Sequence, residues 1–395
     1  MTPASARLPR AIWALGGISL LMDVSSEMIH SLLPLFLVGT LGASVALLGL
    51  LEGIAEATAM ALKVFAGALS DAIGRRKPLA LAGYGLGALA KPLFALALSP
   101  AWVFAARIID RIGKGLRGAP RDALVADLAP AELRGAAFGL RQALDSVGAF
   151  LGPLLAIGLL LLWPGELRLV FWVAVIPAIA CVALLAAAVH EPDTIRAPGW
   201  RNPLRGGGWR RLPRAYYAVL GIAVAMHLAR SSEAFLLLRA QQLGWATAFI
   251  PLVLILMNLV YAASAYPAGR LGDRLPPTRL LGWSLIALIT AHLALALADD
   301  LAVVTLGILC WGLHLGFSQG LLAALVAATA PAELRGTAFG LFNLAAGLAL
   351  LIASVAAGWL WEALAPEAAF FAGAAMAGVA WLLLQGRKGV TTHGE

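Results

Sequence analysis

Long apolar runs, separated by short stretches of Gly, Pro and charged residues, occupy the chain from residue 11 to residue 385. A helix needs about 20 apolar residues to cross the hydrocarbon core of a bilayer, and these runs reach about that length. The pattern predicts twelve membrane-spanning helices. They lie near residues 11–38, 44–69, 79–99, 101–128, 136–162, 168–189, 214–239, 247–269, 279–298, 301–328, 336–361 and 367–385.

The composition excludes a soluble domain. Hydrophobic residues make up 61% of the chain and charged residues 13%, whereas about a quarter of an average soluble domain is charged. The basic start followed by an apolar run resembles a signal peptide, but Asp23 and Glu27 interrupt that run and no small-residue cleavage site follows. We therefore predict an all-α polytopic membrane protein whose first helix is retained.

Basic residues fall in alternate connections between the predicted spans. One set of connections holds Arg7, Arg10, Arg75, Arg76, Lys77, Arg134, six arginines between 196 and 214, Arg270, Arg274, Arg279, Arg335, Arg387 and Lys388. The opposite connections hold only Arg168 and Arg239 among several acids. Cytoplasmic loops carry the excess of Lys and Arg, so both termini are predicted to be cytoplasmic. The net charge of +8 then needs no nucleic-acid partner. We expect a multi-pass protein of the plasma membrane, the inner membrane in a bacterium.

The chain contains an internal duplication. PAELRGAAFGL at 130–140 returns as PAELRGTAFGL at 331–341, with a difference at the seventh position only. A stretch rich in Pro, Gly and Arg at 190–213 has no apolar periodicity and predicts a cytoplasmic linker. We expect an N-terminal six-helix bundle at 1–189 and a C-terminal bundle with a short tail at 214–395. Two parallel repeats predict a pseudo-two-fold axis along the membrane normal, with a binding cavity between the halves.

A conspicuous loop motif, GALSDAIGRRK at 67–77, lies between the second and third predicted spans. It resembles the signature loop of the major facilitator superfamily, and a degenerate copy stands at 269–279. The resemblance implies that fold and a cytoplasmic lock that opens during transport. The residues that it assigns to gating here are Gly67, Asp71, Gly74, Arg75, Arg76 and Asp273.

The run GAFLGPLLAIG at 148–158 resembles the antiporter motif of the proton-driven exporters in that superfamily. Its Gly148, Gly152 and Pro153 permit close helix packing and a kink, and the resemblance implies export. The exporters' fourth-helix motif is half present, because Arg107 is followed by Arg111 and then by Gly113. This second resemblance implies a part for Arg107 in proton transfer.

The fourth predicted span carries one stripe of charge. Its members recur mostly at steps of three and four residues and are Arg107, Asp110, Arg111, Lys114, Arg117 and Arg121. A charge at bilayer depth is costly and usually faces a bundle interior or an aqueous path. We take Arg107, Arg111 and Lys114 as candidate substrate-binding cations, which predicts an anionic or zwitterionic substrate. The alternative is a set of structural ion pairs, such as Asp110 with Lys114 and Arg121 with Asp122 or Asp127.

Other ionisable residues also lie within the predicted spans. Further substrate-binding candidates are His227, Arg230, Glu233 and His314. The candidate acids for proton coupling are Asp23, Glu27, Glu56 and Asp145. Carboxyl groups at bilayer depth are typical of proton relays, although pairing with Lys91, Lys114 or Arg230 would make the acids structural.

The sequence contains no nucleotide-binding motif, no Ser-His-Asp grouping and no short-spaced His or Cys cluster. We expect no enzyme activity, no cofactor and no metal site. The predicted function is secondary transport by alternating access, with proton-coupled efflux of a small organic anion, zwitterion or drug by a monomer in the lipid bilayer. Alternatives are a gradient-driven importer or uniporter of an organic anion, a metal-ion exporter, and a membrane receptor or assembly subunit that does not transport.

Overall fold

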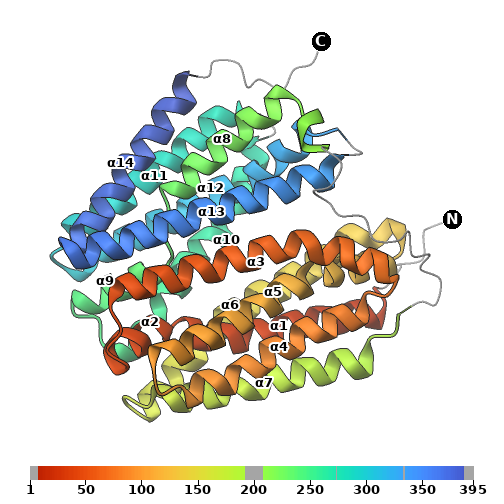
Figure 1. Ribbon diagram of the computed structural model, residues 1–395, viewed down its shortest axis with the longest axis horizontal. Coiled ribbons are helices and arrows are strands. Elements are labelled where there is room, and N and C mark those ends of the chain that lie inside the picture. Colours follow the sequence, from red (N-terminus) through yellow and green to blue (C-terminus); the bar gives the residue numbers. More distant parts are fainter. Residues whose placement is uncertain (1–7, 192–207, 273, 332–333, 387–395) are drawn as a thin grey trace. The chain divides into compact units, whose positions relative to one another are not determined.

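The computed structural model describes residues 8–191, 208–272, 274–331 and 334–386 (Figure 1). All regular structure in these ranges is helical. The chain divides into two compact units, one formed by residues 1–32 and 61–202 and the other by residues 33–60 and 203–395.

The first unit is built around α1 (Arg10–His30), which packs against α6 (Arg134–Leu162) and α7 (Leu167–Ala188). In the same unit α4 (Lys77–Leu96) packs against α7 and, most extensively, against α5 (Pro100–Leu128). The short helix η2 (Ala131–Leu133) precedes α6, and α3 (Val45–Ile73) contributes its residues from 61 onward. Apolar side chains of α1, α4, α5 and α7 form the core; among them are Leu15, Met22, Leu124 and Cys181.

The second unit repeats this packing. Here α8 (Arg214–Leu228) packs against α13 (Arg335–Ala363) and α14 (Pro366–Gly386), as α1 does against α6 and α7. Likewise α11 (Pro277–Leu297) packs against α12 (Leu301–Thr329) and α14, as α4 does against α5 and α7. Its other elements are α2 (Leu33–Leu35), the π-helical turn η1 (Phe36–Thr40), η3 (Gly208–Arg211), α9 (Ala234–Gln242), η4 (Thr247–Phe249) and α10 (Leu252–Gly272). The duplication read from sequence is thus also a duplication of helix contacts.

Within the described residues, ten helical segments are long and apolar enough to cross a membrane. The predicted spans at 101–128 and 214–239 are not among these ten, for different reasons. The α5 helix is 29 residues long but is rich in charge, and α8 is only 15 residues long. Large apolar side chains such as Leu89, Leu162 and Ile176 are more than half exposed, as expected of surfaces that face lipid.

Two of the predicted spans are not continuous helices. The first, expected at 11–38, is interrupted after His30, because Pro34 has no N–H to donate to the His30 carbonyl and its ring clashes there. The seventh, expected at 214–239, breaks between Leu228 and Ala234. The ends of this break are held by polar groups of neighbouring helices, which a hydropathy pattern does not reveal.

Candidate functional site

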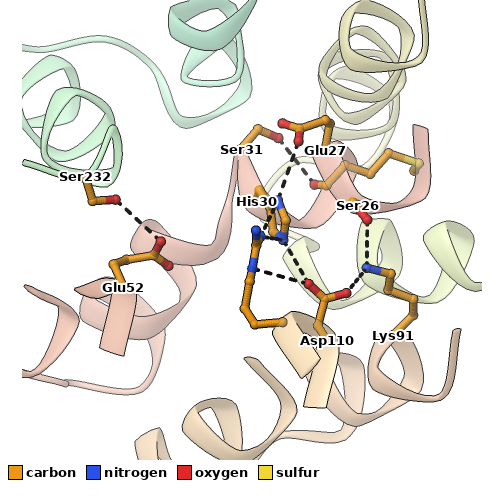
Figure 2. Close-up of polar contacts among 10 residues, drawn as sticks. Ser26, Glu27, His30, Ser31, Glu52, Lys91, Asp110 and Ser232 are labelled. Carbon is orange, nitrogen blue, oxygen red and sulfur yellow. Dashed lines mark hydrogen bonds and ion pairs between the residues drawn. The ribbon is translucent and has the colours of Figure 1, made fainter. Parts of the chain in front are cut away.

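Ionisable side chains of three helices meet inside the first unit. We call this group, which consists of Ser26, Glu27, His30, Lys91, Asp110 and Arg111, the buried charge network. Lys91 Nζ donates to Asp110 Oδ1 at 2.8 Å and to Ser26 Oγ at 3.0 Å, as Figure 2 shows. The Lys91 and Asp110 side chains are 0% and 1% exposed. A buried carboxylate is tolerated only with such partners, so these contacts keep Asp110 compatible with the apolar bundle.

The network continues from Asp110 along α1. His30 Nε2 lies 3.6 Å from Asp110 Oδ2, and His30 Nδ1 lies 3.6 Å from Glu27 Oε1 (Figure 2). The Arg111 guanidinium lies 3.5 Å from Asp110 Oδ2 and 2.8 Å from His30 Nε2. Acids and bases therefore alternate from Lys91 through Asp110 and His30 to Glu27.

Glycine residues make this arrangement possible. A Cβ at Gly83 would lie 2.8 Å from the Gly113 carbonyl oxygen, and a Cβ at Gly113 would lie 2.6 Å from the Gly83 carbonyl oxygen. The backbones of α4 and α5 therefore touch, which brings Lys91 within reach of Asp110. Gly113 is also the glycine of the exporter-like fourth-helix motif that this chain retains beside Arg107.

The fourth-span candidates occupy different environments. Arg107 and Arg111 are 4% and 1% exposed, whereas Lys114 is exposed. The ion pair considered from sequence, Asp110 with Lys114, does not form; Lys91 and Arg111 take that place. Arg117 is buried and stacks on the Tyr84 ring at 5.2 Å.

The coupling candidates Asp23 and Glu27 lie where α1 and α6 touch. A Cβ at Gly148 would lie 3.0 Å from the Asp23 Cβ, and a Cβ at Gly152 would lie 2.8 Å from the Glu27 Cβ. The antiporter-like motif thus packs directly on the α1 turns that carry these two acids. Both acids are partly exposed.

The fourth coupling candidate, Asp145 on α6, lies near two arginines. Its Oδ2 is 3.4 Å from Arg141 and its Oδ1 is 3.8 Å from Arg121. Arg121 also pairs with Asp122 at 3.1 Å, one of the two pairings considered from sequence. The other acid considered for Arg121, Asp127, pairs instead with Arg76. The remaining candidate, Glu56, lies on α3 within the second unit and is partly buried.

The signature loop forms a tight turn between α3 and α4. Gly74 has a φ of +68°, a left-handed conformation that favours glycine. Arg76 Nε lies 2.7 Å from Asp127 Oδ2, and Arg75 is exposed. The carboxylate of Glu191 accepts from the Arg76 and Lys77 backbone N–H groups at the start of α4. Gly67 lies on α3 near Ala119, while the Asp71 side chain and Asp273 lie outside the described residues.

The second unit contains a pocket of about 250 Å³. We call it the Arg230 pocket; its lining comprises Met60, Met226, His227, Arg230, His314, Ser318, Gln319, Leu322 and Phe342. Three of the seven substrate-binding candidates, His227, Arg230 and His314, therefore meet at one cavity. Glu233 is not part of this lining. It lies at the start of α9, beyond the break in the seventh span.

The helix break beside this pocket is stabilised by side chains far away in sequence. His292 Nε2 donates to the Ala229 carbonyl oxygen at 2.8 Å, and the Ser232 N–H donates to Ser354 Oγ at 3.1 Å. Ser232 Oγ donates to Glu52 Oε2 at 3.4 Å (Figure 2). The bonds made by His292 and Ser354 satisfy backbone groups that the break frees, as non-helical backbone at membrane depth requires.

Sequence reasoning missed the Lys91–Asp110 pair and the roles of Glu191 and His292. One signal was present for the pair, since Lys91 is the lone cation within its predicted span and needs an acid nearby. No sequence pattern marked Glu191. His292 stands out as a lone histidine of its predicted span, which favours a hydrogen-bonded core residue, but nothing in the sequence paired it with the break in the seventh span. Within the ranges that the structure describes, no cluster of three His, Cys, Asp or Glu residues has the arrangement of a metal site.

The family model for the Major Facilitator Superfamily matches this chain twice, at residues 15–237 and 215–393. The chain belongs to the major facilitator superfamily. Membership makes it an integral membrane protein of a transporter family, with two copies of the family's repeat. It confirms the resemblance seen in the signature loop.

Relatives across the superfamily support this membership. The chain is 30% identical to an uncharacterised MFS-type transporter of Methanocaldococcus jannaschii, over 95% of this chain and 94% of the relative. It is 24% identical to the multidrug resistance protein MdtH of Edwardsiella ictaluri, over 87% and 85% of the two chains. Among solved structures, the nucleoside transporter NupG (D323A mutant) matches with a TM-score of 0.80 at 13% identity, over 96% of this chain and 100% of that one. At that identity the likeness shows the fold alone.

Proposed function

We propose that this superfamily member is a secondary active transporter that exports a small organic anion or zwitterion in exchange for protons. The observation that carries the proposal is the buried charge network of α1, α4 and α5, where ionisable groups are concentrated in a membrane bundle. Such groups are costly at bilayer depth and typically mark substrate or proton paths. The relationship to a protein named for multidrug resistance favours efflux among the directions considered.

Proton coupling follows from competition between substrate and acid. The proposed coupling acids are Asp23, Glu27, Glu56 and Asp145, with Arg107, Arg111 and Lys114 as cationic partners. A carboxylate near a cation remains ionised, and an arriving anion competes for that cation and makes the acid easier to protonate. Coupling requires that proton and substrate bind with different affinity to inward-open and outward-open states, which is the condition for alternating access.

The gating part of the proposal concerns the signature loops and the α1–α6 contact. We assign the cytoplasmic lock to Gly67, Asp71, Gly74, Arg75, Arg76 and Asp273, and the α1–α6 packing to Gly148, Gly152 and Pro153. The Arg76–Asp127 ion pair at 2.7 Å is the described contact that supports such a lock. Opening the lock would require breaking this pair.

We further propose twelve spans with both termini in the cytoplasm, arranged as functional bundles at 1–189 and 214–395 with a linker at 190–213. The distribution of arginines supports this orientation. A proton-driven exporter works where a proton gradient is maintained, so we place the protein in the plasma membrane, the inner membrane in a bacterium. A monomer holds all the residues that the mechanism uses.

The function is tested in proteoliposomes with fluorescein as an anionic probe, rhodamine 123 as a cationic probe and an imposed pH gradient. We expect gradient-driven accumulation of fluorescein and little accumulation of the cation. Among Asp23→Asn, Glu27→Gln, Glu56→Gln and Asp145→Asn, the variant at the coupling acid should lose accumulation and retain counterflow exchange. The exposed Glu362→Gln serves as a matched control, because it removes a carboxylate at a helix end.

Three outcomes would contradict this proposal. If all four acid variants transport with the pH dependence of the unaltered protein, the acids are structural and a uniporter or sodium-coupled carrier is the better account. If the cationic probe is preferred, the anionic substrate class is wrong. If no flux occurs with any member of a broader panel, a receptor or assembly subunit is favoured.

A further inference from the structure

The Arg230 pocket contains a cation that none of the described carboxylates neutralises. Among the described residues, no Asp or Glu oxygen lies within ion-pair distance of the Arg230 guanidinium, and Arg230 Nε has no hydrogen-bond partner. By contrast, Arg111 in the first unit already contacts Asp110, and Lys91 pairs with the same acid. An unneutralised guanidinium in an apolar bundle is costly, and an anionic ligand would remove that cost.

Two histidines beside Arg230 offer acceptors. His227 Nδ1 lies 2.8 Å from the Ala223 carbonyl oxygen, which can only accept, so this nitrogen carries the proton. His314 Nδ1 likewise lies 3.1 Å from the Ser284 carbonyl oxygen and 2.8 Å from Ser284 Oγ. In each neutral ring Nε2 is therefore the acceptor, and within the described chain neither Nε2 has a hydrogen-bond partner. The carbonyl contacts at Nδ1 favour the same tautomer in both rings.

The rest of the lining is apolar. Met60, Met226, Leu322 and Phe342 contribute to the wall, and the Phe342 ring packs edge-on against His227 with centroids 6.1 Å apart. The volume of about 250 Å³ is near the lower end of the range for small-molecule pockets. A small inorganic anion would leave this apolar surface uncovered, whereas a small organic body would bury it.

We propose that the Arg230 pocket binds a small organic monoanion whose apolar body also carries a hydroxyl or N–H group. Arg230 donates to the anionic group, and Nε2 of His227 or His314 accepts from the ligand's donor. This inference rests on the proposed transport function and refines it, since it adds an anion contact at Arg230 that is separate from the α5 cations used in the coupling step. Specificity then depends on one hydrogen-bond donor, the Arg230 guanidinium, and one acceptor, a histidine Nε2.

The test uses a matched series of probes on the purified full-length protein in detergent, with binding measured by calorimetry. The probes are 4-hydroxybenzoate, benzoate, which lacks the donor, 4-hydroxybenzamide, which lacks the charge, and sodium sulfate. We expect 4-hydroxybenzoate to bind best, with affinity lower by about 10-fold or more without the charge and by about 2- to 10-fold without the hydroxyl. Equal binding of all three aromatic probes, stronger binding of sulfate, or no binding by any probe would overturn the inference.

Variants locate the site. Arg230→Gln should weaken 4-hydroxybenzoate binding by about 10-fold or more, and the exposed Arg211→Gln should leave it unchanged. His227→Phe and His314→Phe together should abolish the preference for 4-hydroxybenzoate over benzoate while benzoate still binds. If Arg230→Gln binds normally and Arg107→Gln does not, the anion is held in the first unit and the inference is wrong. The probe series on the unaltered protein does not depend on any variant folding.

These measurements separate the inference from the proposed function. Binding is measured without a gradient, so intact binding with no proton-driven transport would refute the coupling and leave the pocket assignment standing. Proton-driven transport of fluorescein that is unaffected by Arg230→Gln, with no binding of hydroxybenzoate, would refute the pocket assignment alone.

Discussion

At the scale of single residues, the Lys91–Asp110 pair offers a direct test of what the buried charge network contributes to stability. Lys91→Met leaves a buried carboxylate without its closest cation, and such a loss costs about 3–5 kcal/mol. Asp110→Asn leaves the Lys91 ammonium buried and uncompensated, with a similar cost. We expect the double variant to be much more stable than the sum of the two losses predicts, as measured by thermal unfolding in detergent.

A second ion pair serves as the control for this cycle. Arg239 NH1 and Glu367 Oε1 are also 2.8 Å apart, but Glu367 is 39% exposed. Arg239 is buried, but the Glu367 carboxylate reaches solvent, so the coupling energy of Arg239→Met with Glu367→Gln should be smaller than that of the Lys91–Asp110 cycle. If the two cycles give equal coupling energies, burial is not what makes the Lys91–Asp110 pair important.

The charged residues of α5 could be predicted from the sequence, but their partners could not. The stripe on α5 was visible as a helical periodicity of charge, and Arg107, Arg111 and Arg117 are indeed buried. The partners were not visible, because Lys91 meets Asp110 only through close contact of α4 and α5. Lys114 follows the same periodicity and is nevertheless exposed, since periodicity gives an angle around a helix and not its surroundings.

At the scale of helices, the glycines of α6 should control the contact with α1. A Cβ at Gly152 would lie 2.7 Å from the Val24 carbonyl oxygen, and backbone cannot move aside without shifting a helix. We expect Gly152→Ala to lower stability by about 1–3 kcal/mol through overpacking and to reduce transport. Thermal unfolding and proteoliposome flux would measure the two effects.

Gly158 on the same helix provides the matched control. No atom lies within 4 Å of the position that its Cβ would take. Gly158→Ala should therefore fold and transport normally, with stability equal to or about 0.5–1 kcal/mol above that of the unaltered protein. If Gly152→Ala proves as stable and as active in transport as Gly158→Ala, the close contact between α1 and α6 is contradicted.

The break in the seventh span, between Leu228 and Ala234, could not be predicted from the hydrophobic pattern. The residues from 214 to 239 are apolar enough to predict one helix, and the seryl residues at 231 and 232 are compatible with either helix or turn. The break depends on His292 and Ser354, which satisfy the Ala229 carbonyl and the Ser232 N–H. Those partners follow more than 60 residues later, so local sequence does not contain the reason for the break.

At the scale of the whole chain, the duplication was the most reliable prediction. Near-identical segments at 130–140 and 331–341 required two related halves, and the helix contacts of the first unit return in the second. Hydropathy gave a less complete answer, because α5 and the α8–α9 pair do not have the composition and length of simple spans. Whether these two segments cross the membrane decides between twelve spans and fewer.

The structure gives reasons to expect that both segments cross. The 29 residues of α5 extend about 43 Å, more than the hydrocarbon thickness of about 30 Å. Three charged side chains of this helix are at most 4% exposed and so do not face lipid; they are Arg107, Asp110 and Arg111. For the α8–α9 pair, side-chain hydrogen bonds replace the helical bonds lost at the break. The buried charges of α5 and the irregular backbone of the α8–α9 pair therefore do not prevent crossing.

If both segments cross the membrane, the loops that flank each of them lie on opposite sides. In a background in which Cys181 and Cys310 are replaced by Ala, single cysteines are introduced as Leu98→Cys, Glu132→Cys, Arg211→Cys and Ala246→Cys, all at exposed positions. An impermeant maleimide added to intact cells should label positions 98 and 246, whereas positions 132 and 211 should react only after lysis. Denatured samples check that every cysteine can be labelled. If 98 and 132 react from the same side, α5 does not cross, and the same result for 211 and 246 would exclude crossing by the α8–α9 pair.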